Sequence, residues 1–144
     1  MDTTWESLST DAPELAASIT ARFEANRHHI IGTIRADGSV RLSGIEVEIS
    51  PRRVGVGMMP DSLKLEDVRR DARVELHSAP LDADLVEGDA KLRGVLIEDG
   101  ETLGQPGAAF TLSTITASLV KVVGDQLEFT TWSPKSGRMT RYRQ

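Results

Sequence analysis

The chain has 144 residues, of which 39% are hydrophobic and 27% are charged, and this length suits one domain with a substantial core. It has no cysteine, which excludes disulfides, thiolate catalysis and cysteine-ligated metal sites. The net charge of -5 argues against nucleic acid as a partner. No apolar run approaches the ~20 residues of a membrane helix, and the N-terminus lacks the features of a secretory signal. We therefore expect a single cytoplasmic domain over residues 1–144.

The N-terminal part of the chain predicts one amphipathic helix. Asp11 and Glu14 have the spacing of a capping box, and apolar residues recur at every fourth position from residue 15 to residue 23. We expect this helix over residues 12–26, covering one face or end of a sheet.

A tight turn at Asp37-Gly38 separates two hydrophobic runs. This dipeptide favours a type I′ hairpin turn, in which both central residues have positive φ. We expect strands over residues 30–36 and 39–49 to pair antiparallel across it.

The second of these strands changes phase along its length. Val40 and Leu42 alternate with polar residues in one phase, whereas Ile45 and Val47 follow the other. A bulge or bend at Gly44 would turn both sets of apolar side chains inward, as in small barrels.

The next segment predicts a strand followed by a short helix. Residues 53–58 alternate valine or methionine with arginine and glycine, so one face of this strand is nearly bare and suits close approach by a flat ligand. Ser62 is a suitable N-cap for a helix that carries Leu65 and Val68 and ends near Asp71.

The rest of the chain predicts four more strands and little helix. The first of these strands begins at residue 74, and the other three extend over residues 91–98, 110–123 and 126–132. Polar loops are expected at 81–90 and 98–108. The pattern predicts a mainly β protein: an N-terminal helix, a short second helix and about seven strands in a closed or nearly closed barrel.

Four segments, which together span nearly the whole chain, resemble one known family. They are RHHIIGTIRADGSVRLSGIEVEI, MMPDSLKLEDVRRDARVELH, DAKLRGVLIE and LEFTTWSPKSGRMTRYR. In this order they resemble the pyridoxamine 5′-phosphate oxidase-like, FMN-binding split β-barrel superfamily. The resemblance implies a six- to seven-stranded antiparallel split β-barrel that forms a homodimer, with two flavin sites in the grooves between subunits.

The resemblance also implies eight cofactor-binding residues. Lys64 and Ser62 would hold the flavin phosphate, and Arg41 is a candidate for the same role. The other residues implied near the cofactor are Ser43, Gly44, Met58, Met59 and Trp132, the last of them contributed by the partner chain.

The residues alone leave other roles open. Lys64 also fits a solvated lysine at a helix start, Arg41 a surface salt bridge, and Trp132 a core or interface anchor. No metal site is expected, because the adjacent His28 and His29 point to opposite faces of a strand.

Two departures from the vitamin B6 oxidases affect the expected function. Leu63 stands where those oxidases carry an arginine, and Glu46 stands near where they carry a lysine. The TWSPKSG segment resembles the ending of reductases that use a flavin or the deazaflavin F420. We therefore expect an FMN- or F420-dependent oxidoreductase that moves a hydride to or from a small organic substrate. The alternative is a non-catalytic flavin- or tetrapyrrole-binding protein of the same fold. No catalytic residue is identified, because the cofactor supplies the chemistry in such enzymes.

Overall fold

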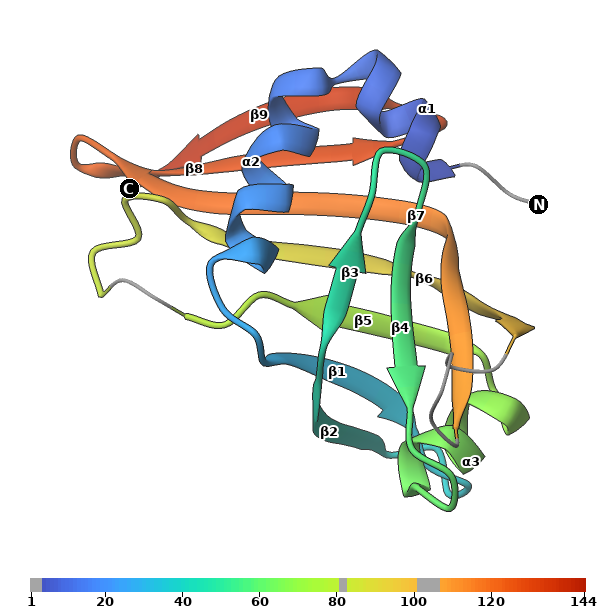
Figure 1. Ribbon diagram of the computed structural model, residues 1–144. Coiled ribbons are helices and arrows are strands. Elements are labelled where there is room, and N and C mark those ends of the chain that lie inside the picture. Colours follow the sequence, from blue (N-terminus) through green and yellow to red (C-terminus); the bar gives the residue numbers. More distant parts are fainter. Residues whose placement is uncertain (1–3, 81–82, 101–106) are drawn as a thin grey trace.

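The computed structural model describes residues 4–80, 83–100 and 107–144, and in them the chain is mainly β (Figure 1). The helices are α1 (Thr4–Asp11), α2 (Pro13–Glu24) and α3 (Leu63–Arg70). The strands are β1 (His29–Ile34), β2 (Val40–Ile45), β3 (Val47–Ile49), β4 (Val54–Met58), β5 (Arg73–His77), β6 (Asp89–Gly100), β7 (Ala108–Val123), β8 (Gln126–Ser133) and β9 (Gly137–Arg143). None of these helices is both long enough and apolar enough to cross a membrane.

All strand pairs are antiparallel, and the described strands form one sheet in the order β2-β1-β5-β6-β7-β4-β3, with β8 and β9 added beside β7. The two ends of this order, β2 and β3, are consecutive in the chain and are separated only by Glu46. The sheet therefore curls until β2 lies against β4 without pairing with it. This arrangement confirms the predicted mainly β, antiparallel split barrel, although it has nine strands rather than six or seven.

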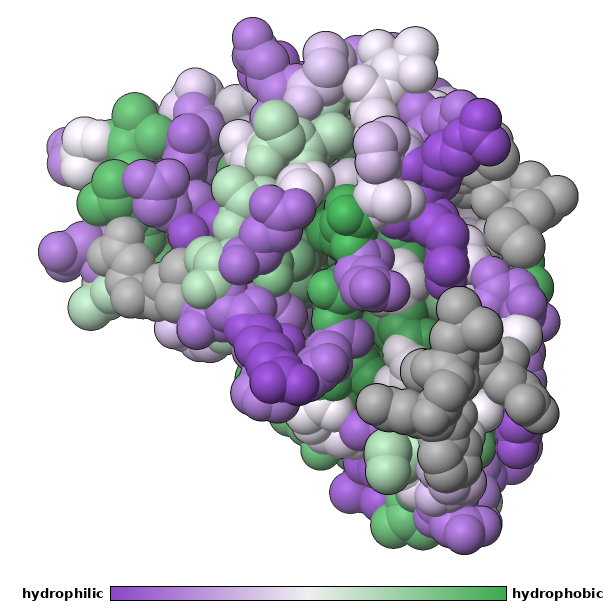
Figure 2. All heavy atoms as spheres, viewed as in Figure 1, coloured by the Kyte–Doolittle hydropathy of each residue, from purple (hydrophilic) through white to green (hydrophobic). Residues whose placement is uncertain are grey.

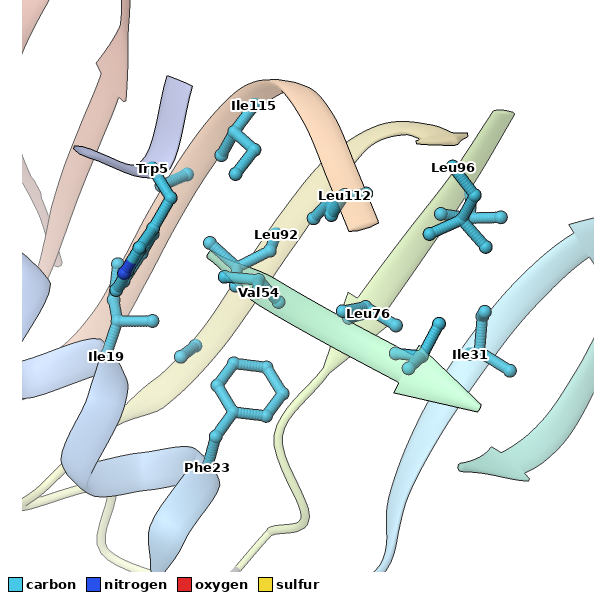
Figure 3. Packing of buried hydrophobic residues seen from close by; sticks show 14 of the residues in the cluster. Trp5, Ile19, Phe23, Ile31, Val54, Leu76, Leu92, Leu96, Leu112 and Ile115 are labelled. Carbon is cyan, nitrogen blue, oxygen red and sulfur yellow. The ribbon is translucent and has the colours of Figure 1, made fainter. Parts of the chain in front are cut away.

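The core lies between the curled sheet and the two N-terminal helices (Figures 1 and 3). Ile19 and Phe23 lie on the buried face of α2, as their four-residue spacing predicts, and Trp5 joins them from α1. The strands contribute Ile31, Val54, Leu76, Leu92, Leu96, Leu112 and Ile115.

The N-terminal capping prediction is wrong. Residues 4–11 form α1, so Asp11 ends a helix, and the N-cap of α2 is Ala12, which makes no side-chain capping bond. The Asp11 carboxylate instead accepts a hydrogen bond from Trp132 Nε1 at 2.7 Å. Helices as short as α1 depend on tertiary contacts, here the burial of Trp5 and Leu8, which is why periodicity does not predict it.

The hairpin at Asp37-Gly38 is present, but its turn is not of type I′. Of the two residues only Gly38 has a positive φ, of 88°. The amide of Gly38 donates to Arg35 O at 2.9 Å, and the amide of Arg35 donates to Ser39 O at 2.8 Å. The loop thus has three residues and ends in a left-handed glycine, which is the next most common hairpin geometry.

The predicted bulge at Gly44 is absent, because β1 and β2 pair without a register shift from His29–Ile45 to Ile34–Val40. Odd-numbered residues of β2 face inward throughout, whereas Val40 is 62% exposed and Leu42 is 71% exposed. Polar side chains can point inward here because Arg41 meets a buried carboxylate, that of Asp67 on α3.

Strand β7 turns a sharp corner midway along its length (Figure 1). At this corner Thr114 has a φ of 55°, and the pairing with β6 shifts register between Arg93 and Val95. Gly94 lies in the shift, where an added Cβ would come within 2.3 Å of Ser113 O. The corner lets β7 pair with β8 along one part and with β4 along another.

The second half of the chain broadly follows its prediction. Strands β5 to β8 occur where the pattern places them, and the predicted loops at 81–90 and 98–108 lie partly outside the described residues. Strand β9 is not predicted, because its side chains are almost all exposed and show no alternation of burial.

Candidate cofactor site

Three elements meet where the barrel is split: β2, the end of β4 and the start of α3. After β4 the chain turns, with Ser62 N donating to Met59 O at 3.3 Å, and α3 begins at the next residue. Ser62 Oγ accepts from Leu65 N at 3.3 Å, which confirms Ser62 as the N-cap. Lys64 Nζ donates to Gly44 O at 2.6 Å and ties the helix to β2.

The start of α3 is suited to an anion. The amide of Leu65 is bonded to Ser62 Oγ and that of Glu66 to Ser62 O at 3.3 Å, which leaves the amides of Leu63 and Lys64 for a ligand or water. Partial burial lowers the pKa of the Lys64 ammonium. An anion at this point would gain from the helix dipole and from the lysine charge together.

Ser43 adds an unsatisfied hydroxyl to this region. Its Oγ is buried and has no hydrogen-bond partner among the described residues. Buried hydroxyls are normally hydrogen-bonded, because an unsatisfied one costs free energy. Ser43 directly precedes Gly44, whose carbonyl accepts a hydrogen bond from Lys64 Nζ. A ligand oxygen at this position would satisfy the hydroxyl.

At Gly44 the backbone of β2 is open on the face opposite to Ser43, because successive residues of a strand point to opposite faces. Among the described residues, no heavy atom lies within 4 Å of the position that a Cβ on Gly44 would take. Met59 is 64% exposed at the mouth of the site, whereas Met58 is only 3% exposed and packs in the core. Of the two methionines, only Met59 presents its side chain outward.

Arg41 faces α3 from β2. Its Nε donates to Asp67 Oδ2 at 2.8 Å, and its side chain is 22% exposed. The salt bridge that the residues alone left open is therefore present, but its acidic partner is buried rather than on the surface.

Trp132 does not lie with the other seven predicted residues. It is on β8, paired with Ala117 of β7, and it is 3% exposed. Its indole nitrogen donates to Asp11. Its position within one chain is thus that of a core anchor that holds α1 to β8.

Sequence reasoning missed Asp67 and two of its three partners. The signal was present: Asp67 lies between the apolar positions Leu65 and Val68, on the face of α3 that the predicted amphipathic pattern buries. Its partners, Thr33 and Arg70, carry no local signal of this kind.

The opposite side of β2 carries an apolar groove on the outside of the barrel, with a volume of about 480 Å³. Its apolar lining includes Ile30, Ile34, Val40 and Leu42. Its charged and titratable lining residues are Arg73, Glu75, His77, Lys91 and Arg93. This groove and the candidate site thus share one strand and lie on its two faces.

On the face seen in Figure 2, hydrophobic side chains gather over β3 and β4, next to α2. A hollow there is lined by Glu24, Val47, Glu48, Ile49, Ser50 and Arg53. It contains none of the eight predicted residues, so the candidate site does not depend on it.

No protein-family model matches the chain, and the comparison with curated protein sequences found no match either. Solved structures do match. PhzG from Burkholderia lata 383, in complex with tetrahydrophenazine-1-carboxylic acid, has a TM-score of 0.67 and 10% identity over 92% of this chain and 89% of its own. A pyridoxamine 5′-phosphate oxidase-related, FMN-binding protein from Nostoc punctiforme PCC 73102 has a TM-score of 0.63 and 8% identity over 92% of this chain and 96% of its own.

A heme binding protein from Mycobacterium smegmatis is also similar, with a TM-score of 0.58 and 13% identity over 80% of this chain and 57% of its own. At such low identities the likeness shows a shared fold. The chain therefore has the fold of the pyridoxamine 5′-phosphate oxidase-like, FMN-binding split β-barrel proteins.

Proposed function

We propose that the protein is a flavin-dependent oxidoreductase that binds FMN at a homodimer interface and moves a hydride to or from a small organic substrate. The observation that carries the proposal is the buried, unpartnered Ser43 hydroxyl next to the Gly44 carbonyl that Lys64 contacts. It supports a polar ligand site at the split of a barrel whose structural relatives include an FMN-binding protein.

The residues at this site fit the phosphate end of FMN. Lys64, the free amides at the start of α3 and the hydroxyl proton of Ser62 are donors, and Arg41 flanks them on β2. A hydrogen bond to a charged group contributes about 1.5–3 kcal/mol, so two or three of them suffice to select a phosphate-bearing ligand. The backbone of Gly44, whose carbonyl accepts a hydrogen bond from Lys64, and the exposed Met59 would lie near the ring system.

When bound, FMN supplies the hydride chemistry, and the protein supplies binding and orientation. This division of labour explains why the site brings together donors for an anion rather than an acid–base pair. Six of the eight predicted residues hence enter the proposal as cofactor-binding residues: Arg41, Ser43, Gly44, Met59, Ser62 and Lys64. Met58 and Trp132 do not, because Met58 packs in the core and the indole of Trp132 donates to Asp11.

The outer groove supports the homodimer. Val40 and Leu42 are apolar and exposed on the strand whose other face carries Arg41 and Ser43. The groove lining carries both signs of charge, Glu75 and the basic residues Lys91 and Arg93, so the same patch on two copies can be complementary across a two-fold axis. A second copy seated there would bring its own residues to the edge of β2.

The deazaflavin F420 is the alternative cofactor, supported by the resemblance of the TWSPKSG segment. The substrate is proposed only as a small organic molecule, and the cysteine-free composition suits the proposed cytoplasmic location.

A second candidate function is non-catalytic binding of a flavin or a tetrapyrrole. The similarity to a heme binding protein supports it, since that protein shares the fold. The half-buried Lys64 and the unpartnered Ser43 favour an anionic group in this case too.

Titration of the purified protein with FMN, F420 and hemin separates these candidates. We expect saturable binding of FMN, seen as quenching of flavin fluorescence, and reduction of the bound flavin by a hydride donor such as NADPH. If the protein quenched the fluorescence of F420 but not that of FMN, F420 would be the cofactor. Binding of hemin without binding of FMN or F420 would favour the second function. Binding of none of the three would contradict the proposal.

A further inference from the structure

The carboxylate of Asp67 lies inside the molecule, on the inner face of α3. Its side chain is 3% exposed, and it accepts hydrogen bonds from Thr33 Oγ1 at 2.7 Å, Arg41 Nε at 2.8 Å and Arg70 Nη2 at 3.1 Å. A buried carboxylate is tolerated only when it is paired and hydrogen-bonded. The three donors, from β1, β2 and α3, meet that condition.

Arg41 is held from behind by this carboxylate. Asp67 is 3% exposed and Arg41 is 22% exposed, so a ligand that approaches from solvent meets the arginine first. Asp67 engages only Nε, and no hydrogen bond joins the terminal nitrogens of Arg41 to another described residue. Its guanidinium is therefore fixed at one edge, with the other edge left for an anion.

A second tie joins the same helix to the same strand. Lys64 lies three residues before Asp67 on α3, and its partner Gly44 lies three residues after Arg41 on β2. Residues three apart share one face of a helix, so both ties leave α3 on the side that faces β2. Together they fix the start of α3, with Ser62 and Lys64, beside Arg41.

The geometry points to Asp67 as a positioning residue of the anion site, which orients Arg41 and anchors α3 without touching the ligand. This inference rests on the proposed function, in which the anion is the phosphate of FMN. Buried partners that orient a binding group commonly contribute 10–100-fold to affinity at metal sites, and we expect the same logic for a phosphate.

A purely structural role is the rival explanation. In that role, loss of Asp67 loosens the barrel and weakens every ligand alike. In a positioning role, its loss weakens ligands with a phosphate and spares those without one. Riboflavin has the ring system of FMN and lacks the phosphate, so the ratio of the two dissociation constants separates the roles.

The test measures FMN and riboflavin binding by Asp67→Asn, by fluorescence quenching, after circular dichroism has shown that the variant folds. We expect FMN affinity to fall by about tenfold and riboflavin affinity by less than twofold. If Asp67→Asn does not fold, Asp67→Glu keeps the charge and displaces it by one methylene, and a smaller loss in the same ratio is expected.

Two variants serve as controls. Asp71→Asn removes a carboxylate from the end of the same helix that pairs with Arg73, and we expect the ratio to stay unchanged. Thr33→Val removes one hydrogen bond to Asp67 and leaves Arg41 in place. We expect it to lower the free energy of unfolding, with a smaller change in the ratio of the two dissociation constants than in Asp67→Asn.

Equal losses for both flavins, or a gain in FMN affinity, would overturn the inference. If the wild-type protein bound neither flavin, the proposed function would fail, and inorganic phosphate would decide the inference. Thermal stabilisation of the wild-type protein by phosphate, lost in Asp67→Asn and kept in Asp71→Asn, would support it; no stabilisation of the wild-type protein would end it.

Discussion

At the scale of single residues, Lys64 and Asp67 are the two side chains that join α3 to β2 at the candidate site. Each reaches from α3 to β2, one to the Gly44 carbonyl and the other to the Arg41 guanidinium. Lys64 could be selected from its position after the N-cap, because a helix start and a basic side chain together favour an anion. Arg41 could also be named from the sequence. Its buried partner, Asp67, could not, because it comes from a distant segment of the chain.

The acid stability of the protein tests the buried carboxylate. Burial raises the pKa of Asp67, but the hydrogen bonds from Arg41, Thr33 and Arg70 outweigh it and hold that pKa below its ordinary value. The stabilisation is then present above pH ~4, the unfolded value, and is lost as the pH falls through the folded pKa.

We expect the free energy of unfolding in urea to fall more steeply below pH ~4 for the wild-type protein than for Asp67→Asn. At pH 7 the variant should be less stable by about 1–3 kcal/mol. The exposed Asp125→Asn is the control and should keep the wild-type slope. Identical slopes for all three proteins would mean that Asp67 is not ionised and paired in the folded state.

At the scale of elements, local pattern accounts for most of the helices and strands. Alternation predicts β4, and a Ser N-cap with spaced apolar residues predicts α3. The pattern fails for α1, which is short, and for β9, whose side chains lie in solvent on both faces. The corner in β7 also escapes prediction, because it depends on Gly94 of a neighbouring strand rather than on residues near Thr114.

Substitution of Gly94 tests this corner. A Cβ at this position would lie 2.3 Å from Ser113 O, a backbone atom that cannot move without disturbing the strand pairing. We expect Gly94→Ala to lower the free energy of unfolding by about 1–3 kcal/mol. Gly32→Ala is a matched control, since the nearest atom to its Cβ would be 3.7 Å away and β1 has no corner. Equal stability of the two variants in chemical denaturation would refute the role given to Gly94.

At the scale of the whole molecule, the main feature is that β2 turns polar side chains inward and apolar side chains outward. In β2 the polar Arg41 and Ser43 face inward, and the apolar Val40 and Leu42 face out. Apolar side chains on a strand normally point inward when a single chain buries them, and the bend predicted at Gly44 follows from that rule. Here the outward set lines the groove that we propose a second copy covers, so the sequence of one chain could not reveal the inversion.

The oligomeric state tests this arrangement. We expect the wild-type protein to have twice the mass of one chain by light scattering, and Leu42→Asp to have the mass of one chain, because a carboxylate would be buried in the interface. Val123→Asp is the matched control: Val123 is also an exposed aliphatic residue, at 45%, but lies at the C-terminal end of β7. A dimeric Leu42→Asp would show that another surface joins the copies, and a monomeric wild-type protein would remove the homodimer from the proposal.

The effect of Lys64→Ala on flavin binding tests most directly whether the start of α3 holds the cofactor phosphate. We predict that the wild-type protein binds FMN more tightly than riboflavin, and that Lys64→Ala lowers FMN affinity at least about tenfold while riboflavin affinity changes little. Lys135→Ala, in the turn before β9, should leave both affinities unchanged. Unchanged FMN affinity in Lys64→Ala, or equal binding of FMN and riboflavin by the wild-type protein, would contradict the placement of the cofactor phosphate at the start of α3.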